Sequence, residues 1–490
     1  MSTGHTQQTS SHEPGLRDLL PSGTLHFMGI GGAGMCALAE AIVRQGGRVT
    51  GCDLAPGDSV KTLERLGVRV WPEHDPGHVE GVVALVVSSA IPGDHPEVAA
   101  AVGAGIPVWK RARALGEWVN RGRVVAVSGT HGKTTTTAMA TEILVRSGWD
   151  PTGFVGGWVP AWKGHLRSGT DDLFVVEADE YDRSFHHLKP SVAIVTNMDA
   201  DHLDVYGDLR GVREGFAKFL EGVRDDGTVL VCADDPGSAS LLPWLSVRAR
   251  SFGFSAGSEL RGLDFASEGM GSRFRVVEDG IDRGLVHLKV AGQHNAVNAL
   301  AAIAAARVLG VEWSAIRSAL GEFVGVVRRF QFLGEEGGVS VVDDYAHHPR
   351  EIEVALTTAR EAHPGSRLVA VFQPHLYTRT RDFSKGFARA LAAADSIWIT
   401  EVYPAREPAI PGVDGALVAR EVESAVDREG QRTRDVRFHG DLESLPGELA
   451  KQLRPGDLCL TLGAGSIERV GAEVLQELRT RASSPESYDA

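Results

Sequence analysis

The chain has 490 residues, of which 43% are hydrophobic and 23% are charged, and its formal net charge is −14. This length predicts roughly two to four domains with ordinary hydrophobic cores. The acidic charge argues against general nucleic-acid binding, and the absence of any run of about 18 apolar residues argues against a membrane span.

The two ends of the chain are predicted to be tails outside the folded domains. The first residues lack the basic and apolar regions of a signal peptide, and we expect residues 1–20 and 481–490 to be disordered.

The four cysteines are widely separated, with no CxxC pair: Cys36, Cys52, Cys232 and Cys459. They suit a reduced, cytoplasmic protein better than a disulfide scaffold or a structural zinc site.

The first block, residues 21–120, begins like a dinucleotide-binding βαβ unit. A strand over 25–30 is followed by a G-x-G-x-x-G pattern, a helix over 35–45 and a second strand ending at Asp53. That acid stands about 20 residues after the glycines, as the fingerprint requires. We predict a Rossmann-like domain that binds a nucleotide or nucleotide sugar; a tight turn with no ligand is the alternative.

The second block, residues 121–331, reads as an ATP-binding domain with a mostly parallel sheet and a small antiparallel sheet. The strand "RVVAVSG" enters a glycine-rich loop, and a helix follows as far as Gly148. "DLFVVEADE" and "PSVAIVTNMDADH" are strands that end in acids or a histidine. A hairpin is expected to turn at Asp279–Gly280, and a helix then carries Asn295 and Asn298 on one face.

The third block, residues 332–480, alternates strands and helices. Strands are expected in "VSVVDDYAHHP", "RLVAVFQPH", "SIWITEVYP" and "DLCLTLGAGS", with helices from about Arg350 and from about Phe383. Such alternation predicts a parallel sheet in a second Rossmann-like domain. The whole chain is therefore predicted to be a three-domain α/β protein.

The loop "GTHGKT" is the strongest functional signal. Glycine at 129 and 132 lets backbone N–H groups approach phosphate oxygens, Lys133 adds a cation, and Thr134 offers a hydroxyl to Mg²⁺. A full Walker pattern would need glycine where Val127 stands, so this loop is shorter. A simple helix cap would leave Lys133 without a purpose, and we predict ATP binding.

With "GTHGKTTTTAM" the sequence resembles the Mur ligases, the ATP-dependent amide ligases of peptidoglycan precursor synthesis. The motifs "EADEYDRSFHHLKPSVAIVTNMDADHLDVYGD", "GQHNAVNALAA", "VVRRFQFLG", "VVDDYAHHP", "FQPHLYTRTRDF" and "EVYPARE" extend the likeness over roughly residues 24–470. Most members have asparagine where His131 stands. Histidine there is typical of members that join L-alanine, or a recycled tripeptide, to UDP-N-acetylmuramate, and the short segment after Ser184 favours L-alanine.

The resemblance implies a reaction in which ATP phosphorylates the lactyl carboxylate of UDP-N-acetylmuramate and L-alanine then displaces phosphate. It also implies Mg²⁺, a cytoplasmic location, and a monomer or homodimer. The three ligands would lie on three blocks, so domain closure is expected.

The resemblance also implies the site residues. The catalytic residues would be Lys133, Glu177 and His202, and the metal ligands Thr134, Glu177 and His202. ATP would contact Gly129, Thr130, His131, Gly132, Lys133, Thr134, Thr135, His294, Asn295, Asn298, Arg328 and Arg329. The UDP-sugar would contact Gly29, Gly31, Gly32, Gly34, Asp53, Ser88, Ser89, His131, Gly156 and Gly157. L-Alanine would contact Tyr345, His347, His348, His375 and Arg379.

Two positions depart from the family pattern. Phe216 stands where many relatives have a carbamylated lysine, so no carbamylation is predicted, and Asn197 or Glu180 would help to hold a second Mg²⁺. Leu376 stands where many relatives have arginine.

Three other functions fit parts of the sequence. The recycling ligase shares the mechanism but uses the tripeptide. A nicotinamide dehydrogenase would use the first glycine motif but leaves Lys133 unexplained. A non-catalytic nucleotide-binding module would bind Mg-ATP without turnover.

Overall fold

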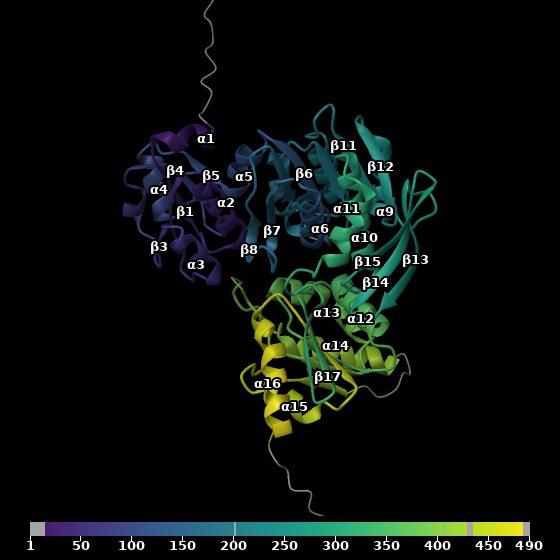
Figure 1. Cartoon of the computed structure of the whole chain (residues 1–490). Helices are drawn as coiled ribbons and strands as arrows, with labels where there is room; N and C mark the ends of the chain where they lie inside the picture. Colours follow the sequence, from purple (N-terminus) through teal and green to yellow (C-terminus); the bar gives the residue numbers. More distant parts are fainter. Residues whose placement is uncertain (1–14, 200–201, 406, 429–434, 484–490) are drawn as a thin grey trace, which may run out of the picture.

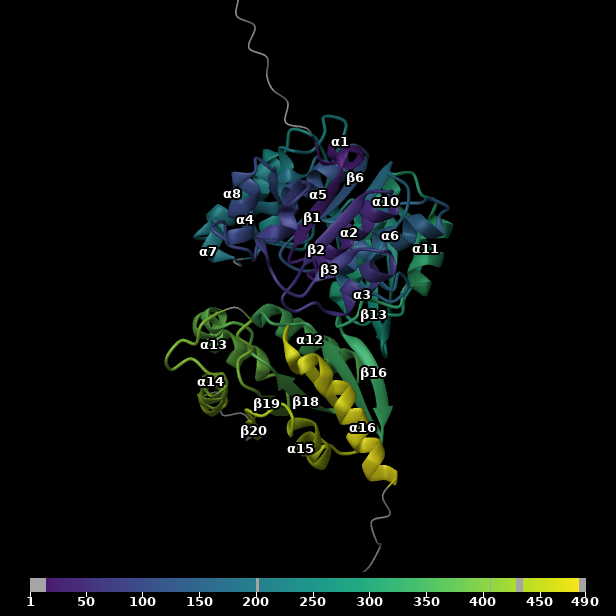
Figure 2. The same cartoon turned by 90° about the vertical axis from the view of Figure 1, so that its left-hand side faces the viewer.

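The computed structural model describes residues 15–199, 202–405, 407–428 and 435–483, which form three α/β domains, each built on its own sheet (Figure 1). The N-terminal and central domains lie side by side at the top of Figure 1, and the C-terminal domain lies below them. Figure 2 shows the same division from the N-terminal side. None of the helices in the described part of the chain is long and apolar enough to cross a membrane.

The N-terminal sheet is entirely parallel, with the order β3-β2-β1-β4-β5. Its strands are β1 (Thr24–Met28), β2 (Arg48–Cys52), β3 (Arg69–Trp71), β4 (Val82–Val87) and β5 (Val108–Lys110). Its helices are α1 (Leu16–Leu19), α2 (Ala33–Arg44), α3 (Asp58–Arg65), α4 (Pro96–Gly103) and α5 (Arg111–Val119), with 3-10 turns η1 (Leu20–Ser22) and η2 (Pro76–Val79). Side chains alternate across β1, so Phe27 packs with α2 while Met28 packs with α4 on the opposite face.

The predicted N-terminal tail is too long. Residues 1–14 lie outside the described residues, but α1 follows directly, and Leu16 is fully buried in the core beneath α5. A four-residue helix carries too little periodicity to be recognised in sequence. At the other end, α16 continues to Ser483 and so includes three residues of the predicted C-terminal tail.

The central domain has one continuous ten-stranded sheet, with the order β15-β14-β13-β12-β11-β10-β6-β9-β7-β8. Its strands are β6 (Arg123–Ser128), β7 (Thr152–Val159), β8 (Gly164–Arg167), β9 (Leu173–Glu177), β10 (Val192–Val195), β11 (Thr228–Cys232), β12 (Arg248–Gly253), β13 (Leu260–Glu268), β14 (Gly271–Glu278) and β15 (Ile281–Leu288). Its helices are α6 (Lys133–Arg146), α7 (Leu203–Tyr206), α8 (Leu209–Leu220), α9 (Pro236–Ala239), α10 (Gln293–Val308) and α11 (Trp313–Glu322), with 3-10 turns η3 (Tyr181–His187) and η4 (Leu242–Trp244).

The predicted antiparallel part extends this sheet at its edge and is not separate from it. β12 and β13 pair in parallel over two residues, and β13, β14 and β15 then pair antiparallel. The predicted hairpin turn is confirmed, because Asp279 and Gly280 have φ of 52° and 80°, as a two-residue hairpin turn requires.

The C-terminal sheet has the order β16-β17-β21-β18-β19-β20. Its strands are β16 (Gln331–Glu336), β17 (Val339–Asp344), β18 (Arg367–Phe372), β19 (Ser396–Ile399), β20 (Asp435–Phe438) and β21 (Asp457–Leu462). Its helices are α12 (Pro349–Ala362), α13 (Tyr377–Leu391), α14 (Gly415–Arg428), α15 (Leu445–Gln452) and α16 (Val470–Ser483), with the 3-10 turn η5 (Ser466–Arg469).

Two details of this domain differ from expectation. The sheet is parallel except at its edge, where β16 and β17 form an antiparallel hairpin around Gly337 and Gly338, both with positive φ. Helix α13 begins at Tyr377, six residues before the predicted start. Its N-cap is Leu376, with φ of 67°, and leucine is not a residue that signals a helix start.

Candidate active site

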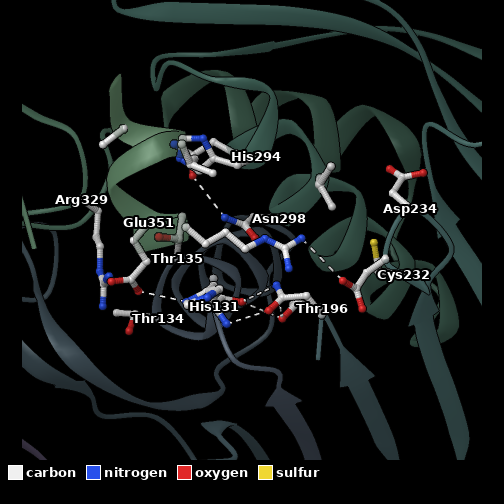
Figure 3. Close-up of a pocket in the computed structure, with 18 of the residues that line it drawn as sticks. His131, Thr134, Thr135, Thr196, Cys232, Asp234, His294, Asn298, Arg329 and Glu351 are labelled. Carbon is white, nitrogen blue, oxygen red and sulfur yellow. Dashed lines mark hydrogen bonds and ion pairs between the residues drawn. The ribbon is translucent and has the colours of Figure 1, made fainter. Parts of the chain in front are cut away.

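A pocket opens where the central domain faces the C-terminal domain (Figure 3). Its walls come from the β6–α6 loop, the ends of β10 and β11, the start of α10, the segment around Arg329, and α12. Of the predicted ATP-binding residues, eight line it: His131, Gly132, Thr134, Thr135, His294, Asn295, Asn298 and Arg329. Segments nearly 200 residues apart in sequence therefore meet around one cavity.

The two glycines of the phosphate loop are required by close packing. Gly129 has φ of 133°, and a Cβ atom there would lie 2.0 Å from the Thr196 hydroxyl oxygen. Gly132 has φ of 84°, and a Cβ atom there would lie 2.4 Å from the Asn298 side-chain oxygen. Both positions exclude larger residues, and the loop leads directly into α6, whose N-terminal N–H groups suit a phosphate.

Lys133 is held by acceptors around the loop. Its Nζ donates to the carbonyl oxygens of Gly129 and Thr130, at 2.7 and 3.1 Å, and to both oxygens of Glu180, at 2.8 and 3.0 Å. Burial acts to lower the pKa of Lys133, but the carboxylates of Glu180, Asp179 and Glu177 together outweigh it, so the pKa is raised. The side chain is therefore a fixed cation.

Oxygen ligands suited to Mg²⁺ meet beside this lysine. Glu177 ends β9, accepts from the Gly156 N–H at 2.7 Å and is hydrogen-bonded to the Thr134 hydroxyl. Burial raises the pKa of Glu177, which leaves a carboxylate whose charged form a cation would stabilise. His202 lies further off, with Nε2 3.9 Å from Glu180. Mg²⁺ is a hard cation that prefers oxygen ligands, and the Glu177 carboxylate and the Thr134 hydroxyl are ligands of this kind.

Phe216 is a core residue. It is fully buried, and its ring lies edge-on to Phe185 with centroids 5.3 Å apart. It offers no atom to a metal.

Three side chains at the start of α10 line the pocket beside the phosphate loop. Asn298 donates to Asn295 at 3.2 Å, and Asn295 donates to the Ala291 carbonyl at 2.9 Å. Burial, helped by the charge of Arg329, lowers the pKa of His294 to about 4. The imidazole is therefore neutral near pH 7 and presents a flat surface suited to a base.

The structure separates the two arginines at the second junction. Arg328 points into the C-terminal domain, where it donates to Asp343 at 2.9 Å, to Glu468 at 3.0 Å and to the Gly463 carbonyl. Arg329 lines the pocket instead. In Figure 3 its guanidinium lies on the same side of the pocket as Glu351 and Thr134.

Glu351 joins the two domains across the pocket. Its carboxylate accepts from His131 Nδ1 at 3.0 Å and from the His347 N–H at 3.0 Å. Burial acts to raise the pKa of Glu351, but His347 and His131 outweigh it and hold the pKa well below its usual range. His131 Nε2 is buried with no hydrogen-bond partner among the described residues.

Four of the five predicted alanine-binding residues form one group on the C-terminal domain. His347 lies 5.2 Å from Tyr345 and 5.8 Å from His375 between ring centroids, and Arg379 Nη1 lies 3.4 Å from His375 Nδ1. His348 faces elsewhere. It caps α12 by accepting from the Arg350 N–H, and its ring packs against Phe383 and His131. We therefore leave His348 out of this group.

The predicted UDP-sugar residues lie in three places, one of which is His131 in the phosphate-loop pocket. At the N-terminal glycine loop, Asp53 accepts from the Gly31 N–H at 2.8 Å, and Ser88 lies against Gly29. Gly156 and Gly157 lie on β7. His165 connects the two regions, because Nδ1 donates to the Gly157 carbonyl at 2.9 Å and Nε2 is 3.3 Å from the Ser59 hydroxyl of α3.

Sequence reasoning missed three residues of this arrangement. They are Glu351, His165, and Arg111, whose guanidinium lies 3.0 Å from where a Cβ of Gly34 would stand. No local pattern marks His165 or Arg111. The capping-box glutamate of "HHPRE" was the one available signal for Glu351.

Asp344 leads to a pH prediction. It lines the pocket and accepts from the N–H groups of Phe330 and Ala346 at 2.6 and 2.7 Å, and burial raises its pKa to about 7. Between about pH 4 and that value the folded protein holds a proton that the unfolded chain has lost, so stability falls as pH rises. Asp344→Asn removes this titration. The melting temperature of the variant minus that of wild type, measured without nucleotide, is expected to increase between about pH 5 and about pH 8. A constant difference would contradict the assignment.

The chain folds into three α/β domains, and a phosphate-loop pocket lies between the central and C-terminal ones. With the Arg329 cation reaching this pocket from the second junction, the arrangement defines a multidomain nucleotide-binding enzyme. Family models match in chain order. "Mur ligase family, catalytic domain" matches residues 24–123, "Mur ligase middle domain" 127–306, and "Mur ligase, glutamate ligase domain" 328–465. The chain belongs to the Mur ligase family, whose members are ATP-dependent.

Individual relatives extend the match over nearly the whole chain. A UDP-N-acetylmuramate–L-alanine ligase of Syntrophobacter fumaroxidans is 40% identical over 461 residues, covering 94% of this chain and 97% of the relative. The crystal structure of the UDP-N-acetylmuramate–alanine ligase of Thermotoga maritima matches with TM-score 0.78 and 29% identity, covering 94% of this chain and all of that one. A murein peptide ligase of Psychrobacter arcticus matches with TM-score 0.67 and 25% identity, covering 93% and 99%.

Proposed function

We propose that this protein joins L-alanine to the lactyl carboxylate of UDP-N-acetylmuramate, using ATP and releasing ADP and phosphate. One observation carries the proposal. The phosphate-loop pocket lies at the same domain boundary as the Tyr345, His347, His375 and Arg379 group, so a phosphorylated acid and an amine could meet there. The 40% identity to an L-alanine ligase supports the choice of substrates.

The chemistry requires phosphorylation, because a free carboxylate is a poor electrophile. Bringing that carboxylate to ATP places like charges together, and two unit charges about 4 Å apart repel by about 4 kcal/mol at an effective dielectric of about 20. Lys133 and Arg329 would supply opposing charge from two sides. L-Alanine's amine then forms the amide bond as the acyl–phosphate bond breaks, and phosphate leaves with the electron pair.

We propose that Glu177 and Thr134 hold Mg²⁺, with His202 near the transferred phosphate. The ion would neutralise charge on the phosphate oxygens. Glu177 is kept in place by the Gly156 N–H, and Thr134 by its position in the first turn of α6.

Each of the three domains is assigned one of the three substrates. We propose that residues 21–120 bind the UDP moiety at the Gly29–Gly34 loop, with Asp53, Ser88 and Ser89 nearby, and that residues 121–331 bind ATP. Residues 332–480 would bind L-alanine, with Arg379 holding its carboxylate. Cytoplasmic location is part of this proposal, because the four cysteines are free, as is usual in a reducing compartment.

Phosphate release with a panel of amine substrates tests the proposal. With UDP-N-acetylmuramate and Mg-ATP present, L-alanine is expected to give the highest kcat/KM, above glycine, L-serine and the tripeptide L-Ala-D-Glu-meso-diaminopimelate. Equal or faster turnover with the tripeptide would identify the recycling reaction instead. ATP binding with no phosphate release from any combination would leave only a nucleotide-binding module.

A further inference from the structure

A second group of reactive side chains is buried in the N-terminal domain, on the face of the sheet covered by α4 and η2. It consists of His26 on β1, Cys52 at the end of β2, His78 in η2 and Glu97 in the first turn of α4. One ligand atom from each lies within 4.8 Å of all the others. None of these side chains has a role in the proposed reaction.

The contacts within this group are close. Glu97 Oε1 lies 2.9 Å from His26 Nε2 and 3.6 Å from His78 Nδ1, and Cys52 Sγ lies 3.4 Å from His26 Nε2. The Glu97 and His26 side chains are fully buried. A fifth side chain adjoins them, since His74 Nδ1 is 3.0 Å from Cys52 Sγ.

An ion pair between His26 and Glu97 does not account for this arrangement. It satisfies one carboxylate and one imidazole. The Cys52 thiol makes only long contacts to the same carboxylate, at 3.5 and 3.7 Å, and two more imidazoles lie 3.6 and 3.8 Å from it. His78 Nδ1 is buried and makes no hydrogen bond within the described part of the chain, although it faces Glu97. A buried ring nitrogen in this state can take up an ion or another ligand, and here it faces a carboxylate and a thiol.

The geometry and donor types match those of tetrahedral zinc. With Zn–N near 2.0–2.1 Å and Zn–S near 2.3 Å, ligand atoms stand roughly 3.3–3.7 Å apart. The Cys52–His26, Cys52–Glu97 and His78–Glu97 separations of 3.4, 3.5 and 3.6 Å fall in this range, and all pairs lie within 4.8 Å. Thiolate and imidazole select zinc over magnesium or calcium. His26 is already oriented, because its Nδ1 lies 2.9 Å from the Thr50 hydroxyl, which leaves Nε2 for the metal. His78 is fixed by stacking on Trp71, with centroids 4.3 Å apart.

We propose that His26, Cys52, His78 and Glu97 bind one zinc ion. Binding would release the Cys52 thiol proton to solvent and leave a site of zero net charge, formed by the dication, one thiolate and one carboxylate. His74 is placed to replace one of the four or to add a fifth contact.

The site would stabilise the glycine loop of the same domain. The Cys52 carbonyl accepts from the N–H groups of Gly29 and Ile30 at 2.8 and 3.2 Å, and the next residue, Asp53, accepts from Gly31. A metal bound to Cys52 would therefore fix the end of β2 and, through it, the loop. The role is structural and does not depend on which ligase reaction the protein performs.

Metal analysis and cobalt spectroscopy test the proposal on tag-free full-length protein. Protein dialysed against zinc and then passed over a desalting column is expected to hold one equivalent by elemental analysis. Co²⁺ added to metal-depleted protein in excess Mg²⁺ is expected to give a sulfur-to-cobalt charge-transfer band. Mg²⁺ occupies the oxygen site near Glu177, so the band reports a thiolate site alone.

Two variants and two controls complete the test. Cys52→Ser is expected to abolish the charge-transfer band, and His78→Phe, which keeps the stacking on Trp71, to weaken zinc binding at least tenfold. Cys36→Ser, in α2, and Cys232→Ser, at the nucleotide pocket, are expected to keep the band. Zinc should raise the melting temperature of wild type more than that of His78→Phe. Absence of stoichiometric zinc, a band that survives Cys52→Ser, or unchanged zinc affinity in His78→Phe would overturn the proposal.

Discussion

Replacement of Lys133 by methionine is expected to lower kcat/KM for ATP-dependent phosphate release by at least about 10²–10³-fold, the usual effect of removing one preorganised charge at a transition state. Its Nζ is anchored by the Gly129 and Thr130 carbonyls, at the turn where the phosphates would lie. Methionine keeps the length of the side chain but not the charge. Steady-state kinetics with varied ATP measures the effect.

The control for this variant concerns Glu180. Loss of Lys133 leaves the Glu180 carboxylate buried, at 3% exposure, without its cation, which would destabilise the fold by itself. The double variant Lys133→Met/Glu180→Gln removes both charges and is expected to recover the melting temperature but not the activity. Activity within tenfold of wild type in a folded double variant would rule out a catalytic role for Lys133.

Alanine substitutions at the two adjacent arginines are expected to have different effects, one on stability and the other on catalysis. Arg328→Ala breaks a buried ion pair with Asp343, which is 2% exposed, and should reduce the free energy of unfolding by about 3 kcal/mol. Arg329→Ala removes a cation that acts on Glu177, His294 and Glu351 together, and should lower kcat/KM for ATP by at least about 10²-fold.

Each arginine variant is the control for the other. Melting temperatures and ATP kinetics measured on both variants should show a stability loss confined to Arg328→Ala and a kinetic loss that is far larger in Arg329→Ala. If Arg328→Ala kept full stability while losing ATP-dependent activity, the assignment of the two side chains would be reversed.

The local elements of the fold could be predicted because their signals are local. β6, the glycine loop and α6 follow one another within about 25 residues, and each obeys a preference that acts between near neighbours in the chain. The same holds for the hairpin at Asp279–Gly280, whose residues favour positive φ. The start of α13 escaped prediction because its hydrogen-bond acceptors come from a distant segment: the Leu376 N–H donates to the Tyr403 carbonyl and the Thr378 N–H to Glu407.

What the sequence alone determined, then, is the division into three blocks of alternating strands and helices, the phosphate loop and the family. Only the tertiary structure decided which side chains meet. Arg329 lines the pocket, whereas Arg328 points into the C-terminal domain. Glu351 is hydrogen-bonded to His131. The ring of His348 packs against Phe383, away from the group that contains His347. The tertiary structure also gathered Cys52 with His26, His78 and Glu97, although cysteine spacing argued against zinc. The reason is physical. Backbone preferences depend on neighbours along the chain, whereas distances between side chains from separate elements are set by how whole sheets and helices pack.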